Sequence, residues 1–327
     1  MRLTSSILFI LISMHVYSQE NDRATKYAKT ITAKELMENL YVYSSDYFQG
    51  RETGTIGQKR AIDFLQNFYT RSEIDPAAGT QNYLQPMQLN IKNEMVQTEN
   101  VVAIIEGSKY PNEYIIISSH LDHIGINSKG EINNGADDDG SGTVAILEIA
   151  EAFKIAADEG YGPKRSLIFL HVTGEEKGLL GSKYYTENPL YPIADTTVNL
   201  NVDMIGRVDP KRDNNDPNYL YLIGSDKLSQ ELHEISEQTN KKYTNINIDY
   251  TFNDEKDPNR FYYRSDHYNF AKKNIPVIFY FSGTHEDYHR PGDTADKINY
   301  PILEKRTKLI FYTAWQLANR KNRVMLN

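Results

Sequence analysis

The chain has 327 residues, of which 39% are hydrophobic and 24% are charged, and this composition is typical of a soluble globular protein. The formal net charge is -8 and no long basic run is present, which argues against binding to nucleic acids or to anionic membranes. Cysteine is absent, which excludes disulfide bonds and a lipid anchor on cysteine.

The first 18 residues have the features of a secretory signal peptide. Arg2 supplies a positive charge, residues 7–12 supply an apolar core, and residues 16–18 supply a cleavage signal. Ser13 and His15 interrupt the apolar run too early for it to span a bilayer; a buried N-terminal strand is the alternative. We therefore predict a signal peptide over residues 1–18, one domain over residues 19–327, and export to the bacterial periplasm or medium without a membrane anchor.

The sequence that follows alternates between helical and strand patterns. Thr32, with Glu35 three residues later, forms a capping box that predicts the start of a helix. Apolar residues at helical spacing predict a second helix over residues 58–70. Residues 84–91 and 100–107 have the composition of strands, and we expect them to pair at one side of a sheet.

Further along the chain, runs of β-branched and bulky apolar residues without helical spacing predict buried strands. These strands cover residues 113–119, 166–173, 196–205, 219–223 and 275–281, and the helices cover residues 143–158, 227–239, 266–273 and 302–317. The Tyr- and Asn-rich residues 243–263 predict a long functional loop or lid. Strands that alternate with helices predict a single α/β domain, with a mostly parallel central sheet and helices on both faces.

Two adjacent carboxylates follow one of the buried strands. The Gly-Glu-Glu-Lys-Gly segment 174–178 comes shortly after Val172, and Gly174 allows the backbone to turn. Open α/β sheets bind ligands at the carboxyl ends of their strands, and adjacent anions require a cation or a shared proton. Our working hypothesis is that Glu176 binds a metal and that Glu175 takes a proton from metal-activated water. A solvated acidic turn is the alternative.

Polar clusters also lie at the ends of other predicted strands. His120 and Asp203 each end a strand, residues 137–139 are three consecutive Asp residues, and a late loop carries Tyr288 and His289. Each has an ordinary explanation by itself, as a packed histidine, a solvated turn, a calcium site or a turn cap. Because these strand ends are expected to meet in one crevice, the set of carboxylates and imidazoles predicts a site for zinc or a similar divalent ion.

At these residues the sequence resembles peptidase family M28, the zinc aminopeptidases and their relatives. Five segments in the same order carry the resemblance: residues 119–122, 134–142, 174–178, 201–206 and 288–294. The resemblance extends from about Gly50 to the C-terminus. It implies a zinc-peptidase fold with the active site at the carboxyl ends of the strands, and it makes residues 19–327 an M28-like metallopeptidase domain.

The resemblance further implies two zinc ions (Zn²⁺) per chain. The side chains that would bind them are His120, Asp138, Glu176, Asp203 and His289. Asp138 would bridge the ions, His120 and Asp203 would hold one of them, and Glu176 and His289 would hold the other.

Three further roles are implied by the same family pattern. Glu175 would be the general base, and Tyr288 would steady the tetrahedral oxyanion. Asp122, two residues after His120, would orient the imidazole of that ligand.

Several other polar residues have a structural explanation that we favour. Asp266 is expected to cap the short helix that follows it rather than to shape the site. His123 is expected to line the crevice rather than to bind metal. Arg207, Arg260 and Arg264 are expected to form surface salt bridges rather than to meet a substrate carboxylate.

Together these features predict an exported di-zinc aminopeptidase, acting as a monomer on peptide substrates. A free substrate amine could bind one zinc, which favours cleavage of the N-terminal residue. A carboxypeptidase on the same scaffold would need a cationic pocket for the substrate carboxylate. A glutaminyl cyclase resembles the same motifs, but it typically carries Trp where this chain has Tyr288. A non-catalytic binding module usually lacks a ligand or the base, and none is missing here.

Overall fold

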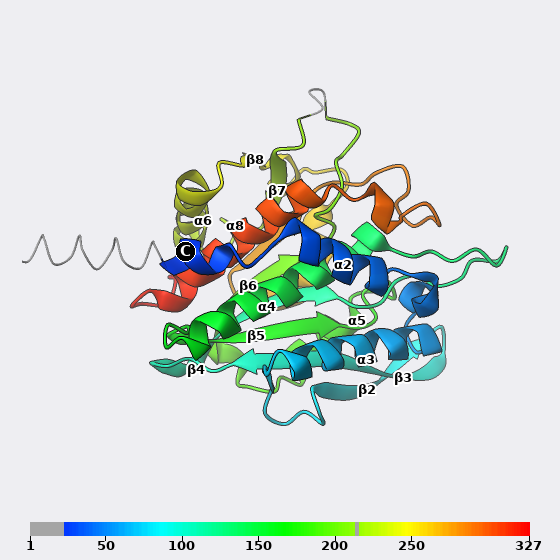
Figure 1. The fold of residues 1–327 in the computed structure, drawn as a ribbon, viewed down its shortest axis with the longest axis horizontal. Coiled ribbons are helices and arrows are strands. Elements are labelled where there is room, and N and C mark those ends of the chain that lie inside the picture. Colours follow the sequence, from blue (N-terminus) through cyan, green and yellow to red (C-terminus); the bar gives the residue numbers. More distant parts are fainter. Residues whose placement is uncertain (1–22, 213–215) are drawn as a thin grey trace, which may run out of the picture.

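A mixed β-sheet runs through the centre of the protein, with helices on both of its faces (Figure 1). The computed structural model describes residues 23–212 and 216–327, so the predicted signal peptide lies outside the described residues. The helices are α2 (Ala33–Tyr43), α3 (Ile56–Arg71), α4 (Gly142–Asp158), α5 (Leu180–Glu187), α6 (Gln230–Tyr243), α7 (His267–Ala271) and α8 (Tyr300–Asn319). The strands are β1 (Asp75–Pro76), β2 (Leu84–Ile91), β3 (Glu94–Ile105), β4 (Tyr110–His120), β5 (Arg165–Val172), β6 (Thr196–Val202), β7 (Tyr219–Ile223), β8 (Asn247–Asp249) and β9 (Val277–Phe281).

The sheet has a parallel centre and antiparallel flanks. Its strand order is β1-β3-β5-β4-β6-β9-β7-β8, and β2 pairs with β3 outside this path. Strands β5, β4, β6 and β9 are mutually parallel, whereas β3 is antiparallel to β2 and β5, and β7 is antiparallel to β9. The predicted α/β domain and the predicted pairing of residues 84–91 with the next strand are confirmed. Strand β3 begins earlier than expected, at Glu94, because its largely exposed first half pairs with β2.

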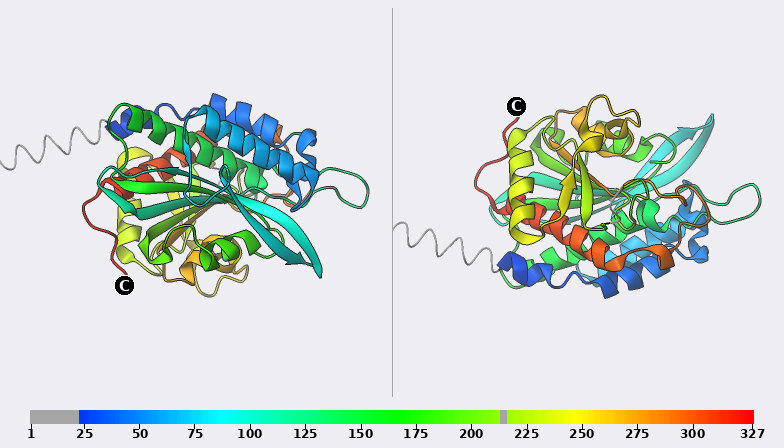
Figure 2. Two further views of the ribbon diagram at one scale, coloured as in Figure 1. Left: turned by 90° about the horizontal axis from the view of Figure 1, so that it is seen from below. Right: turned by 90° about the horizontal axis from the view of Figure 1, so that it is seen from above.

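Alternate residues of the central strands pack into two different cores. Ile115 and Ile117 of β4 pack with helices α2, α3, α4 and α8, whereas Ile116 packs in the core that contains Tyr185 of α5 and Phe270 of α7. Figure 2 shows α2, α3 and α4 on one side of the sheet and α5 with α7 on the other. Every residue of β5 and β6 is buried, as expected for strands covered on both faces.

Local signals set the ends of several elements. The hydroxyl of Thr32 accepts a hydrogen bond from the backbone N–H of Glu35 at 3.2 Å, which confirms Thr32 as the predicted N-cap. The Glu35 carboxylate accepts from the Thr32 hydroxyl at 2.7 Å, whereas a full capping box would use the backbone N–H of Thr32. The predicted loop over residues 243–263 is more ordered than expected, because it contains the end of α6, strand β8 and short 3₁₀ turns at Thr251–Asn253 and Phe261–Tyr263.

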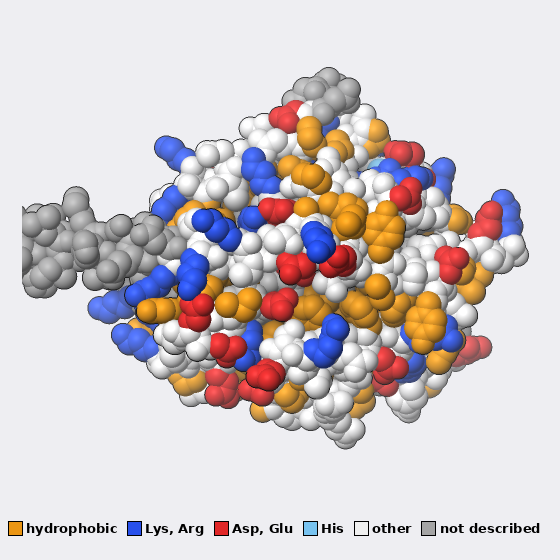
Figure 3. Space-filling model, viewed as in Figure 1, with side chains coloured by type: hydrophobic (Ala, Val, Ile, Leu, Met, Phe, Trp, Pro, Cys, Tyr) orange, Lys and Arg blue, Asp and Glu red, His pale blue; other side chains and the backbone are white. Residues whose placement is uncertain are grey.

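The distribution of charged side chains on the surface agrees with the acidic composition of the chain. On the face shown in Figure 3, acidic and basic side chains are interspersed and no large basic patch is present. Within the described ranges, the helices lack the combination of length and apolar character that crossing a membrane requires.

Glu148 of α4 provides a test of the packing between helices. Its side chain is buried, accepts a hydrogen bond from Asn39 at 3.0 Å, and has a pKa raised from 4.5 to about 8 by burial and by the negative charge of Glu35 and Glu151. Between these two pKa values the folded chain holds a proton that the unfolded chain has lost, so the stability that the protonated group contributes falls as pH rises.

We therefore expect Glu148→Gln to gain stability relative to the original protein as the pH is raised from about 5 to about 9, by roughly 1–3 kcal/mol. Urea unfolding at both pH values measures the difference. A stability difference that is the same at the two pH values would contradict the assignment.

Candidate metal centre

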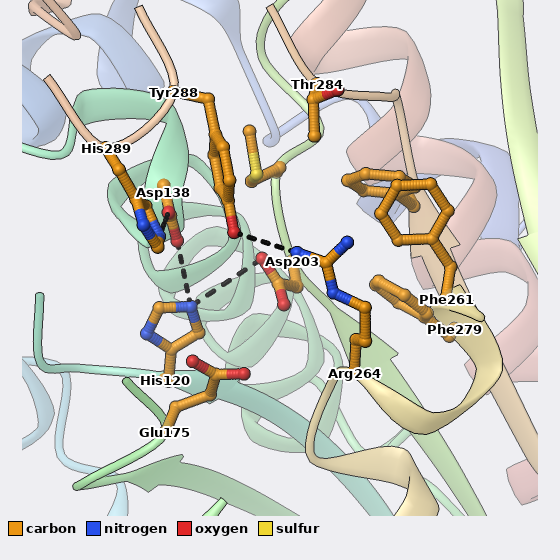
Figure 4. A pocket seen from close by; sticks show the side chains of 12 residues that line it. His120, Asp138, Glu175, Asp203, Phe261, Arg264, Phe279, Thr284, Tyr288 and His289 are labelled. Carbon is orange, nitrogen blue, oxygen red and sulfur yellow. Dashed lines mark hydrogen bonds and ion pairs between the residues drawn. The ribbon is translucent and has the colours of Figure 1, made fainter. Parts of the chain in front are cut away.

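Side chains from parallel strands and from two loops meet at the carboxyl edge of the sheet (Figure 4). His120 is the last residue of β4, and Asp203 directly follows β6. After β5 the backbone turns at Gly174, which has a φ of +62°, and the acidic pair of residues 175 and 176 follows. Asp138 comes from the loop before α4 and His289 from the loop after β9. The convergence expected from the sequence is present in the structure.

His120, Asp138 and Asp203 form the first group of side chains that could hold a cation. The Nε2 atom of His120 lies 3.1 Å from Oδ1 of Asp138 and 3.6 Å from Oδ1 of Asp203. All three side chains are buried. The structure thus brings together the residues that the family pattern assigns to one zinc ion.

Glu176 and His289 form a second group on the other side of Asp138. The Nε2 atom of His289 lies 3.1 Å from Oδ2 of Asp138 and 3.2 Å from Oε2 of Glu176. His123, which sequence reasoning placed only as a lining residue, belongs to this group. Its Nδ1 atom lies 2.9 Å from Oε1 of Glu176 and 3.8 Å from Oδ2 of Asp138. Asp138 therefore presents one carboxylate oxygen to each group.

Several buried polar atoms of these groups have no hydrogen-bond partner within the described part of the chain. They are Oδ2 of Asp138, Oε1 of Glu176 and both ring nitrogens of His123. Leaving such atoms unpaired in the interior is costly unless a ligand compensates. Carboxylate oxygens and imidazole nitrogens, without sulfur, are a donor set that suits zinc and similar divalent cations. The residues present therefore fit one divalent cation in each group.

The electrostatic surroundings of the two glutamates differ. Burial and the charge of Asp138 would raise the pKa of Glu176, yet His123 and His289 lower it to about 2. Burial raises the pKa of Glu175 well above its ordinary value, against an opposing effect of His120. Glu175 thus has a stronger tendency to take up a proton than Glu176, which is the difference expected between a general base and a ligand.

The orientation of His120 is set by a backbone group. Its Nδ1 atom lies 3.0 Å from the carbonyl oxygen of Asp122, which only accepts, so Nδ1 carries the proton and Nε2 is left to face the carboxylates. The Asp122 carboxylate, which we expected to orient this ring, lies 4.0 Å from Nδ1. It instead accepts hydrogen bonds from the hydroxyl of Thr53 at 2.8 Å and from the backbone N–H of Glu175 at 3.1 Å. The Asp122 side chain therefore positions Glu175.

The neighbours of Asp138 hold loops together. Asp139 accepts hydrogen bonds from the backbone N–H groups of His120, Gly142 and Met204 at 3.0–3.2 Å. Asp293 accepts from the backbone N–H groups of residues 137 and 138 at 3.0 and 3.1 Å. Backbone amides thus hold these two buried carboxylates on either side of Asp138, so only the middle of the three consecutive Asp residues is a member of both cation groups.

The Arg51 side chain also holds the loop that carries Asp138, and the sequence did not predict this role. Its fully buried guanidinium donates to the carbonyl oxygens of Leu121 at 3.2 Å, Asn134 at 2.7 Å and Gly135 at 2.8 Å. The preceding Gly50 has a φ of +66°, and a Cβ there would lie 2.4 Å from a backbone oxygen. The adjacent Gly50 and Arg51 were the signal in the sequence that could have suggested this role. Only the fold shows which carbonyl oxygens Arg51 contacts.

An open pocket lies beside the two groups. Its polar wall contains Glu175 and Tyr288, and the apolar wall consists of Met204, Phe261, Phe279 and Phe281. The ring of Tyr288 stacks on His289, with ring centroids 3.9 Å apart. Burial raises the pKa of the Tyr288 hydroxyl, as do the nearby carboxylates, so this hydroxyl keeps its proton at neutral pH.

Two expectations for residues near the pocket had different outcomes. Arg207 forms the expected salt bridges, at 3.0 Å to Glu286 and 3.1 Å to Asp287. Asp266 does not cap α7, because its side chain makes no cap hydrogen bond and is fully buried. Burial raises the pKa of Asp266 from 3.8 to about 7. The sequence pattern at the start of α7 suggested a cap at Asp266. It could not show that this end of the helix is buried.

Comparison with known sequences gives a family and several relatives. The pattern of "Peptidase family M28" matches residues 100–314. "Leupeptin-inactivating enzyme 1" of Streptomyces exfoliatus is 30% identical over 82% of this chain and 57% of its own length. A "Probable leucine aminopeptidase" of Arthroderma otae is 29% identical over 68% of this chain and 58% of its own length. The chain thus spans somewhat over half the length of these relatives.

Solved structures share the fold at low sequence identity. The Legionella pneumophila LapA aminopeptidase superposes with a TM-score of 0.71 at 22% identity, over 92% of this chain and 76% of that one. A Porphyromonas gingivalis glutaminyl cyclase superposes with a TM-score of 0.68 at 18% identity, over 86% of this chain and 97% of that one. The fold is therefore shared by proteins of both names, and the residues of the site must separate them.

The role of Arg51 can be tested by Arg51→Met, which keeps the length of the side chain but removes the donors. Three buried carbonyl oxygens then lose a hydrogen bond to a charged donor; the Leu121 oxygen keeps the Tyr43 hydroxyl and the Gly135 oxygen keeps the Gly140 N–H, whereas the Asn134 oxygen loses the donor at 2.7 Å. We therefore expect a loss of about 3 kcal/mol or more in the free energy of unfolding. Urea denaturation measures it. Arg60→Met, at a residue whose guanidinium donates to one exposed carbonyl, is the matched control and should cost less than about 1 kcal/mol. Equal effects of the two changes would refute the role.

Proposed function

The chain belongs to peptidase family M28, and from this premise we propose that it is a two-metal aminopeptidase that removes N-terminal residues from peptides. The observation that carries the proposal is the pair of side-chain groups that share Asp138, with Glu175 facing the same pocket. The names of the sequence relatives support an aminopeptidase, and the apolar wall of the pocket suits the side chain of an apolar N-terminal residue.

We assign His120 and Asp203 to one cation, Glu176 and His289 to the other, and Asp138 to both. The distances within each group and the unpaired buried atoms support this assignment. When bound, two zinc ions would polarise the scissile carbonyl, activate a water and provide a position for the substrate amine.

The protein side chains then carry the proton transfers. Glu175, held by the contact between its backbone N–H and Asp122, takes a proton from the attacking water and delivers it to the leaving amine. Tyr288 keeps its phenolic proton and donates a hydrogen bond to the oxyanion of the tetrahedral intermediate. The apolar pocket wall limits the access of water to this step.

A glutaminyl cyclase is the alternative on the same fold. The residue before the late histidine is Tyr288, not the Trp that is typical of cyclases. The carboxylates and imidazoles of both cation groups are present, which supports a hydrolase with two cations. We also propose export of the protein, on the basis of the charged, apolar and polar order of residues 1–18.

His123 is the additional ligand that we propose for the second cation. Its ring is fully buried, neither nitrogen has a hydrogen-bond partner within the described chain, and Nδ1 faces Glu176. Unpaired ring nitrogens alone do not identify a ligand, because both ring nitrogens of the buried His267 are also unpaired. His123 is distinguished by the carboxylates beside its Nδ1 atom, at 2.9 Å from Glu176 and 3.8 Å from Asp138. An imidazole with a free lone pair beside two carboxylates is suited to binding zinc.

A panel of aminoacyl p-nitroanilides and short peptides, assayed with added zinc or cobalt, should be hydrolysed when the N-terminus is free and resist when it is acetylated. Glu175→Gln should lower kcat by about 1,000-fold or more, because the proton acceptor is lost, while the metal content stays that of the original protein. Preferential cleavage of acetylated peptides, or ammonia release from an N-terminal Gln peptide, would instead indicate the carboxypeptidase or the cyclase.

His123→Ala should weaken the binding of one of the two cations by roughly tenfold or more, as measured by competition with a chelator, and should change the visible absorption of the cobalt-substituted protein. His233→Ala is the matched control, because His233 of α6 contacts Ser225 and Tyr250 and belongs to neither cation group. Unchanged affinity and an unchanged cobalt spectrum in His123→Ala would remove it from the ligand set.

A further inference from the structure

Arg264 lies in the pocket beside the metal groups, between the turn Phe261–Tyr263 and helix α7. Figure 4 shows its guanidinium on the pocket side of the loop, close to Tyr288 and Asp203. One of its nitrogens, Nη2, donates to the hydroxyl of Tyr288 at 3.4 Å, and Cζ lies 4.9 Å from the centroid of the Phe261 ring. The side chain therefore borders the space into which a substrate would bind.

No carboxylate of the described residues forms an ion pair with Arg264. Sequence reasoning favoured a surface salt bridge here, and other arginines of this half of the protein do form one, such as Arg207 with Asp287 and Arg212 with Asp249. A guanidinium that lines a pocket and has no ion-pair partner among the described residues is available to an anionic group of a ligand.

The backbone around Arg264 is held in place on both sides. The Asp257 carboxylate accepts hydrogen bonds from the backbone N–H groups of Asn259 at 2.9 Å and Phe261 at 3.0 Å. On the other side, the hydroxyl of Ser265 donates to Oδ2 of Asp203 at 2.6 Å. The backbone on either side of Arg264 is thus held close to the proposed metal ligands, while its own side chain is exposed at the pocket.

The surroundings of Arg264 favour a carboxylate with an apolar body. Phe261, Phe279 and Phe281 form the wall next to it, and Phe261 is buried. Aromatic walls exclude water and strengthen a charged hydrogen bond formed against them. A planar guanidinium can also bind both oxygens of one carboxylate.

We propose that Arg264 is the binding group of a subsite for a substrate carboxylate, either the acidic side chain of the N-terminal residue or the free C-terminus of a dipeptide. This inference rests on the proposed function, because it concerns the same pocket. It adds a class of substrate, anionic short peptides, to the reaction.

The test compares Arg264→Leu with Arg260→Leu, in which the neighbouring guanidinium packs on Tyr263 at 4.7 Å and does not line the pocket. The substrates are glutamyl and leucyl p-nitroanilide, and the dipeptide Leu-Gly with its C-terminal amide. In Arg264→Leu the ratio of kcat/KM for the anionic over the neutral member of one pair should fall about 10- to 100-fold. The ratio removes any loss that both substrates share through Tyr288.

The two pairs distinguish the source of the carboxylate. A fall confined to the p-nitroanilide pair identifies the side chain of the N-terminal residue, and a fall confined to the dipeptide pair identifies the C-terminus. Arg264→Lys should recover part of the ratio, because it keeps the charge but not the fork. Unchanged ratios in both pairs, or equal changes in Arg260→Leu, overturn the proposal.

A binding measurement keeps the subsite separate from the reaction. Calorimetric titration of the zinc-loaded protein with L-glutamate and with L-glutamine should show tighter binding of glutamate, and Arg264→Leu should remove this preference if the side chain is the carboxylate recognised. Leu-Gly and its amide are the corresponding pair for the C-terminus, titrated into the Glu175→Gln protein so that they are not hydrolysed. If no substrate is hydrolysed, the proposed function fails, and these binding ratios still decide the subsite.

Discussion

The crowding of acidic groups at one edge of the sheet is the constraint on which the rest of the site depends. Asp138, Glu175, Glu176 and Asp203 lie in one pocket region next to the end of β4, and like charges at such distances cannot all remain ionised without compensation. Imidazoles between the carboxylates supply part of that compensation, and divalent cations are suited to supply the remainder. The sheet positions the groups, because parallel strands end at the same edge.

A second set of charged groups acts on the backbone rather than on substrate. Asp139 and Asp293 accept backbone N–H groups on either side of Asp138, and Arg51 donates to the carbonyl oxygens of the same loop. Each buried charge is thereby satisfied by backbone dipoles, which lets the loop remain irregular inside the protein. The loop that carries the candidate ligand Asp138 is thus held by other charged side chains. Asp139, Asp293 and Arg51 have this structural role, which is separate from metal binding and catalysis.

The pocket has these polar groups on one side and an aromatic wall on the other. The polar groups would carry the reaction, and the aromatic wall would contact the substrate side chain. Glu175 faces the space from one side and Tyr288 from another, while Phe261 and Phe279 border the part away from the metal groups. The side chain of an N-terminal residue would be read by that apolar part, and any carboxylate by Arg264. Under the proposed function, Phe261 and Arg264 would contribute to substrate preference; their segment, 251–265, contains two short 3₁₀ turns and no strand of the sheet.

The sequence by itself determined the α/β class, the buried strands and the residue types gathered at their ends, because hydrophobic runs and glycine turns are local signals. It also placed His120, Asp138 and Glu176 together through their family pattern. Only the tertiary structure decided that His123 faces the second group and that the Asp122 carboxylate holds the backbone of Glu175 rather than the ring of His120. It also showed that Arg264 contacts Tyr288 and forms no ion pair with a carboxylate in residues 23–212 or 216–327. These outcomes depend on which distant segments pack together, and contacts between segments far apart in the chain leave no local pattern in either one.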